Sequence, residues 1–139
     1  MSVPESANAR LFYRCAMHRL AEARILSDAG CITAGPVYLA GYGIECVPKA
    51  LILNSVPAAK EEAALRAFRG NKAHDYVWLR EVYSDESGMR LPLEIGRIFA
   101  LVSDWSTELR YEPRNFKPIE IDLFLRGASE IFHWADGRL

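Results

Sequence analysis

The 139-residue sequence predicts an all-α fold, an antiparallel up-and-down four-helix bundle with an extra short helical excursion at about residues 58–84. Three observations lead to this prediction. Apolar residues recur at intervals of three and four along several long segments, as they do in amphipathic helices. No segment alternates apolar and polar residues for long enough to indicate a strand. Short links join the long segments, which favours antiparallel packing within one domain, residues 1–139.

The first two long helices are expected at residues 4–29 and 35–54. Gly30 ends the first of them, because glycine readily adopts the conformation that follows a helix. Pro36 suits the first turn of the second helix, where its missing N–H is not needed. Pro48 stands inside that helix, where a proline removes a backbone hydrogen bond and costs about 3 kcal/mol. We therefore expect a bend at this position.

The remaining chain is expected to hold two short and two long helices. Residues 58–68 are rich in alanine, glutamate and leucine, and residues 74–84 begin with a capping pattern, so both segments are expected to be short helices. The third and fourth long helices are expected at 91–111 and 118–136. In the last helix one apolar stripe is expected to face the core: Ile121, Leu125, Ala128, Ile131 and Ala135.

The composition excludes several classes of function. The formal net charge is −1, so the chain is not a strongly basic nucleic-acid binder, and an anion site must come from local groups of arginines. No run of about 18 apolar residues is present, and the first ten residues lack a signal core, so we expect neither membrane spanning nor secretion. Cys15, Cys31 and Cys46 are odd in number and form no CxxC pair, which favours reduced thiols in the cytoplasm.

Motifs for cofactors and metals are absent from the sequence. It contains no glycine-rich phosphate loop, no GxSxG and no HExxH. The three histidines, His18, His74 and His133, do not have the spacing of metal ligands. We therefore expect no cofactor and no metal.

The stretch YLAGYGIECVPKALI, residues 38–52, holds the first candidate site. Glu45 and Lys49 are four residues apart, so on a helix they face the same side. They form either an exposed pair, worth about 0.2–0.5 kcal/mol, or a buried pair, in which the carboxylate requires a cation. Gly41 and Gly43 favour burial, because small residues allow helices to cross closely at this point.

The second candidate is RGNKAHDYVWL, residues 69–79. His74 and Asp75 open a predicted helix, with Asp75 as a capping residue and His74 near the positive end of the helix dipole. An exposed histidine at this position is suited to acid–base chemistry, whereas the alternative is a capping or packing role. Arg69 lies five positions before His74.

The third candidate is DWSTELRYEPRNFK, residues 104–117. Arg110, Arg114 and Lys117 gather cationic groups at the predicted end of a helix, with Tyr111 and Phe116 between them. Arginines interleaved with aromatic residues can hold phosphate while the rings stack on bases. The alternative is a solvated helix end, where cations interact favourably with the helix dipole.

These segments together resemble bacterial HEPN-domain proteins, over about Ala7 to Trp134. The resemblance rests on YLAGYGIECVPKAL, on HDYVWL about 25 residues later, and on W(x)4RY beginning at Trp105. It implies a small helical bundle that often dimerises. Some members are RNA-cleaving toxins or phage-defence effectors, and others bind nucleotides or pair with a separately encoded nucleotidyltransferase. The family's polar pattern carries over to six residues: Glu45, Lys49, His74, Asp75, Arg110 and Tyr111.

One part of the family pattern is missing. Ribonuclease members carry a histidine four to six residues after an arginine near the start of the last long helix. No histidine stands at these positions after Arg110 or Arg114, and the Arg69–His74 pair has the spacing but lies mid-chain. Pro48 also stands where the family usually has a helix former. The resemblance thus favours a non-catalytic module.

Three functional hypotheses follow. The first is a module that binds a nucleotide, an RNA or a protein partner, with Glu45 orienting Arg110 and leaving Lys49 and His74 for phosphate. The second is a partner subunit, for example of a nucleotidyltransferase, that docks through the face around Tyr38, Tyr42 and Trp78.

The third hypothesis is a metal-independent endoribonuclease of a toxin–antitoxin or phage-defence system. It would act as a homodimer, with His74 as general base and Arg69 or Arg110 stabilising the charged transition state.

Overall fold

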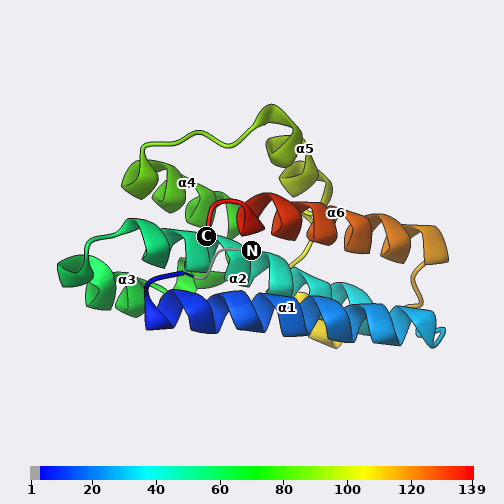
Figure 1. The fold of residues 1–139 in the computed structure, drawn as a ribbon. Helices are drawn as coiled ribbons and strands as arrows, with labels where there is room; N and C mark the ends of the chain where they lie inside the picture. Colours follow the sequence, from blue (N-terminus) through cyan, green and yellow to red (C-terminus); the bar gives the residue numbers. More distant parts are fainter. Residues whose placement is uncertain (1–3) are drawn as a thin grey trace.

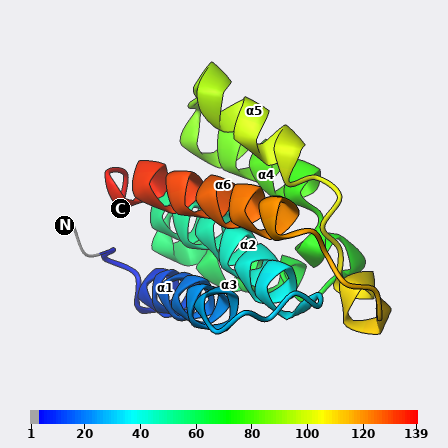
Figure 2. The ribbon, with the colours of Figure 1, turned by 90° about the vertical axis from the view of Figure 1, so that its right-hand side faces the viewer.

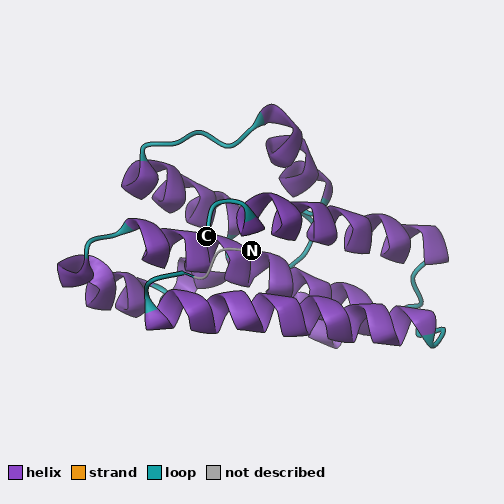
Figure 3. Ribbon diagram, in the orientation of Figure 1, coloured by secondary structure: helices purple, strands orange, loops and turns teal. Residues whose placement is uncertain are grey.

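The computed structural model describes residues 4–139, and every regular element among them is a helix (Figures 1 and 3). This confirms the all-α prediction. The α-helices are α1 (Ala7–Asp28), α2 (Gly35–Ser55), α3 (Glu61–Ala67), α4 (Tyr76–Ser87), α5 (Leu93–Leu101) and α6 (Pro118–Asp136). Short 3-10 helices lie between them: η1 (Ala58–Lys60), η2 (Asn71–His74) and η3 (Thr107–Tyr111).

Helix α2 occupies the centre of the arrangement. It packs against α1, α4 and α6, and α6 also contacts α1 and α5. Figures 1 and 2 show α1 running antiparallel to α2 and α6, with α4 and α5 on the side of α2 and α6 that faces away from α1. This central position explains why α2 is the most apolar of the long helices and is buried around most of its circumference.

The ends of the helices follow local sequence signals. The Ser6 hydroxyl accepts a hydrogen bond from the Ala9 N–H at 3.1 Å and so caps α1. Helix α2 begins with Pro36 in its first turn, as predicted. It continues through the buried Pro48 to Ser55, so the proline removes a hydrogen-bond donor without ending the helix.

The predicted helix at 91–111 is wrong beyond Leu101. Helix α5 ends there, and the chain turns before η3 begins at Thr107. Serine side chains form hydrogen bonds with backbone groups in this turn. The Ser103 hydroxyl donates to the Ala100 carbonyl at 2.7 Å, and the Ser106 hydroxyl accepts from the Glu108 N–H at 3.2 Å. The turn allows Trp105 to enter the core, where only 5% of it is exposed.

The two glycines of α2 meet different neighbours. A Cβ at Gly43 would lie 3.0 Å from Leu20 Cγ and 3.3 Å from the Ala16 carbonyl oxygen, so Gly43 allows α1 to approach closely, as predicted. A Cβ at Gly41 would instead overlap the Trp105 indole. The close approach at Gly41 is therefore made by a side chain from the turn after α5 and not by another helix.

The core combines residues from all the long helices. Its largest fully buried apolar side chains on α2, α4 and α6 are Ile44, Ile52, Leu53, Leu79 and Ile131. On α6 the predicted stripe is buried, since Ile121, Leu125, Ala128, Ile131 and Ala135 are each at most 2% exposed. No helix within residues 4–139 combines the length and the apolar character that crossing a membrane requires.

Candidate functional site

Glu45 and Lys49 form a buried ion pair on the central helix α2. The two residues are 3% and 5% exposed, and Lys49 Nζ lies 2.8 Å from Glu45 Oε2. The ammonium group also lies near two aromatic rings, 5.8 Å from the centre of Phe12 and 5.6 Å from the centre of Phe68. Of the two readings of the sequence, the buried pair is the one found. Lys49 is consequently engaged inside the protein and not placed to meet a phosphate at the surface.

The second oxygen of the Glu45 carboxylate contacts the imidazole of His74. Its Nδ1 lies 2.6 Å from Glu45 Oε1, while 48% of the His74 side chain is exposed. With a proton on Nδ1, the ring donates to the buried carboxylate, which fixes the orientation of the imidazole. The opposite nitrogen, Nε2, is then the one left for a ligand. The sequence indicated both residues, but their contact spans 29 positions and had not been predicted.

Asp75 has the capping role predicted for it. Its Oδ1 accepts hydrogen bonds from the Val77 N–H at 2.9 Å and the Trp78 N–H at 3.3 Å at the start of α4. These bonds satisfy two N–H groups that would otherwise have no partner in the helix. They also hold the first turn of α4 directly after His74, so the cap helps to define where the imidazole lies.

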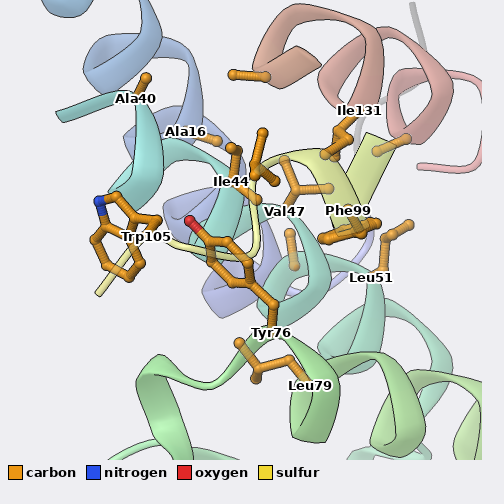
Figure 4. Close-up of a cluster of buried hydrophobic side chains, with 14 of the residues drawn as sticks. Ala16, Ala40, Ile44, Val47, Leu51, Tyr76, Leu79, Phe99, Trp105 and Ile131 are labelled. Atoms are coloured by element: carbon orange, nitrogen blue, oxygen red, sulfur yellow. The ribbon is translucent and has the colours of Figure 1, made fainter. Parts of the chain in front are cut away.

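An aromatic cluster surrounds the imidazole. The Tyr42 ring meets the rings of His74 and Trp105 edge to face, with centroids 6.2 and 5.2 Å apart, and the Tyr38 hydroxyl donates to the Tyr42 hydroxyl at 3.2 Å. Trp105 stacks on Tyr76 at 5.4 Å. Figure 4 shows these two rings side by side next to Ile44.

Two hydrogen bonds fix this cluster to the backbone of α2. Trp105 Nε1 donates to the Tyr38 carbonyl at 3.2 Å, and the Tyr76 hydroxyl donates to the Gly41 carbonyl at 2.8 Å. Both buried polar groups are thus satisfied without solvent. The cluster is therefore a rigid wall beside His74.

The environment suppresses ionisation of several groups near Glu45. Burial, the hydrogen bond with Tyr38 and the Glu45 charge raise the pKa of Tyr42 to about 12, against an opposing effect of Arg110. Burial and the same carboxylate raise the pKa of Tyr76 well above its usual value. Burial, followed by the Glu45 charge, raises the pKa of the Cys46 thiol to about 12, which disfavours a nucleophilic thiolate.

The raised tyrosine pKa values predict a loss of stability at high pH. Tyr42 has a pKa of about 12 in the folded chain and 10.0 as an ordinary tyrosine, and the same values hold for Tyr13, where burial and the Asp136 hydrogen bond are the causes. Below pH 10 both phenols are neutral in the folded and in the unfolded chain, so their full contribution to the free energy of unfolding is present. Between pH 10 and 12 the unfolded state ionises first, so the free energy of unfolding falls. Urea unfolding across this range checks the fall.

The variant Tyr42→Phe should show a shallower decline of stability between pH 10 and 12, because it lacks one of these phenols. Tyr111→Phe is the matched control, since Tyr111 is 71% exposed. An equal decline in wild type and Tyr42→Phe would contradict the assignment.

An open cavity of about 520 Å³ lies beside His74, between α4, α5 and the turn after α5. Its lining includes the imidazole of His74 and the guanidinium of Arg80, and Tyr76, Phe99 and Trp105 contribute aromatic rings. The Arg80 guanidinium lies 5.1 Å from the centre of the Phe99 ring. Sequence reasoning missed Arg80, although a signal exists: Tyr76, Arg80 and Tyr83 share one helical face, and both tyrosines are buried.

A second cavity, of about 400 Å³, is also lined by Trp105. It has a mainly apolar lining that includes Val37, Leu109, Phe116 and Phe124. Trp105 lines both this cavity and the one at His74, so a single indole forms a wall of each.

The other predicted site residues lie elsewhere. Arg69 is exposed in the turn between α3 and η2. Arg110 and Tyr111 lie on η3, where both are exposed and the guanidinium is 5.1 Å from the Tyr111 ring. Arg110 lines a separate small cavity together with Tyr38.

The predicted pairing of Glu45 with Arg110 is wrong. Within residues 4–139 the ion-pair partners of Glu45 are Lys49 and His74, which use both of its oxygens. The prediction placed Arg110 on a long third helix antiparallel to α2, but the chain leaves the helix after Leu101. The arginine thus reaches the region through η3 and affects Tyr42 only by its charge.

The geometry is that of a surface histidine held by a buried carboxylate at the rim of a cavity with an aromatic wall. In the described part of the chain, no group of three or more His, Cys, Asp or Glu side chains is arranged to hold a metal ion. Comparison of the chain with models of known protein families, with curated proteins and with solved structures finds no match.

Proposed function

We propose that this chain is a HEPN-like helical module that binds a nucleotide or an RNA through a phosphate group at His74, without cleaving it. In this proposal α1, α2 and α6, together with the α4–α5 pair, correspond to the four members of the family's bundle. The observation that carries the proposal is the 2.6 Å contact between His74 Nδ1 and Glu45 at the rim of the 520 Å³ cavity. When both ring nitrogens are protonated, Nδ1 donates to Glu45 and Nε2 donates to a phosphate oxygen.

The buried lysine supports this role indirectly. Lys49 contacts one oxygen of the Glu45 carboxylate and supplies its counter-charge, while the other oxygen holds the imidazole. Tyr42 packs edge-on against the ring and limits its rotation. The histidine is thus preorganised, which lowers the entropic cost of binding.

Calorimetric titration with AMP, ATP and a short single-stranded RNA tests the proposal. We expect wild type to bind at least one of these, and His74→Ala to bind it about tenfold or more weakly, as for the loss of one charge-assisted hydrogen bond. His18→Ala is the matched control, because His18 is an exposed histidine on α1. No binding by wild type, or equal binding by His74→Ala, would disprove the proposal.

A metal-independent endoribonuclease is the second candidate, and the same contact favours it. A neutral imidazole whose Nδ1–H donates to a carboxylate has the form of a general base. His74 would then remove the proton from a ribose 2′-hydroxyl, whose oxygen bonds to the adjacent phosphorus and forms a 2′,3′-cyclic phosphate. The bond from phosphorus to the 5′-oxygen breaks, and this oxygen takes a proton from water. Incubation of labelled RNA with wild type and His74→Ala decides between the candidates: cleavage by wild type alone supports the nuclease, whereas equal cleavage by both, or none by either, excludes it.

A further inference from the structure

The Arg80 guanidinium forms no ion pair within the described residues 4–139. It lies on the core-facing side of α4, six positions after His74, and is only partly exposed. Its Nε atom is shielded from solvent and has no hydrogen-bond partner within residues 4–139. Its neighbours include the Phe99 ring, whose centre lies 5.1 Å from the guanidinium carbon, and Gly96. A partly desolvated guanidinium in such a place is costly, and an anion would reduce that cost.

The Arg80 guanidinium and the His74 imidazole face one cavity. Arg80 and His74 line the same 520 Å³ cavity, whose lining contains a single acidic side chain, that of Asp75. The Oδ1 of Asp75 is already bonded to two N–H groups of α4. Glu81 and Asp85 line a neighbouring cavity that also touches Arg80, together with Arg90. Of the two groups, His74 has a carboxylate partner in Glu45, whereas the Arg80 guanidinium forms no ion pair within residues 4–139.

We propose that His74 and Arg80 together hold a terminal phosphate, so that the site selects nucleotides or RNAs that end in a phosphate over those that end in a hydroxyl. This inference rests on the proposed function, because it assigns the class of ligand to the same site. A phosphomonoester carries up to two charges and has three free oxygens, which suffice for donors from two residues. An internal diester carries one charge on two free oxygens. The planar guanidinium matches phosphate oxygens with paired donors.

The aromatic lining fits the rest of such a ligand. Tyr76, Phe99 and Trp105 line the cavity next to the imidazole and the guanidinium, and rings of this kind contact bases and riboses without sequence preference. The site thus recognises the terminal phosphate of an RNA or nucleotide and does not read the base sequence.

The test compares three forms of one short RNA, labelled internally and ending in a 5′-phosphate, a 3′-phosphate or hydroxyls at both ends. Fluorescence anisotropy should show that wild type binds one phosphorylated form about 10- to 100-fold more tightly than the hydroxyl form, as charge-assisted hydrogen bonds predict. Arg80→Gln should lose most of this preference, because only His74 then remains to hold the phosphate. Arg90→Gln, which removes a nearby exposed arginine, should keep the preference.

The outcomes separate this inference from the proposed function. Equal affinity of wild type for all three forms would overturn the inference and leave the binding function intact, whereas no binding of any form would remove both. An undiminished preference in Arg80→Gln would overturn the role of Arg80. If Arg80→Gln does not fold, Arg80→Met keeps an apolar stem against Phe99, and its circular dichroism verifies the fold before the same measurement is made.

Discussion

Gly41→Ala should lower the free energy of unfolding by about 3–5 kcal/mol, the range for removing a buried tryptophan side chain. The added Cβ would overlap the Trp105 indole, so the ring has to leave its place. Its departure breaks the hydrogen bond to Tyr38 and the stacking on Tyr76. Guanidinium unfolding measures the loss of stability, and tryptophan emission shifted to longer wavelength reports the displaced ring.

Two controls identify the cause. Gly96→Ala places a Cβ 3.6 Å from the Arg80 guanidinium, an ordinary contact, so it should be neutral or stabilise α5 by up to about 1 kcal/mol. In a Trp105→Ala background, Gly41→Ala should cost little, because the overlapping ring is absent. Full stability of Gly41→Ala in the wild-type background would contradict the packing described for Trp105.

Glu45→Leu should destabilise the protein by about 3–5 kcal/mol, as expected when a buried ion pair loses one member. Lys49 would keep its place between Phe12 and Phe68 without a counter-charge, and His74 would lose the acceptor of its Nδ1 proton. Chemical unfolding followed by circular dichroism measures the effect.

The double variant Glu45→Leu/Lys49→Met should recover most of this loss, because it removes both charges and keeps an apolar side chain at each position. As a control, Glu22→Gln breaks the pair between Arg19 and Glu22, whose side chains are 36% and 44% exposed, and should cost at most about 1 kcal/mol. If Glu45→Leu is no more harmful than Glu22→Gln, the buried pair does not stabilise the fold.

Sequence reasoning predicted most of the helices because their signals are local. The ends of α1, α2 and α6 follow from capping residues, prolines and apolar periodicity, and each lies within three residues of its predicted position. The prediction of the third long helix was wrong because of a contact between residues far apart in the sequence. Residues 91–111 keep helical periodicity, but the turn after Leu101 depends on the space that Gly41 leaves for Trp105, more than 60 positions earlier.

Sequence reasoning identified three residues that the structure brings together but did not predict the contact between Glu45 and His74. Glu45, Lys49 and His74 were identified from spacing and from the position of a helix start. The contact between Glu45 and His74 depends on how η2 packs against α2, and the spacing of residues in the sequence does not encode this packing. Arg80 was overlooked because an arginine in a helix is most often solvated, and its burial becomes visible only when α5 brings Phe99 beneath it.

The shared position of Trp105 has a consequence for measuring ligands. The Trp105 indole borders both the His74 cavity and the cavity lined by Val37 and Phe124, so a ligand in either cavity will alter its emission. Because the ring is anchored to the backbone at Tyr38, a displacement of the ring by a ligand in one cavity will also change the shape of the other. The molecule therefore contains its own optical reporter, and two ligands added together should interfere rather than act independently.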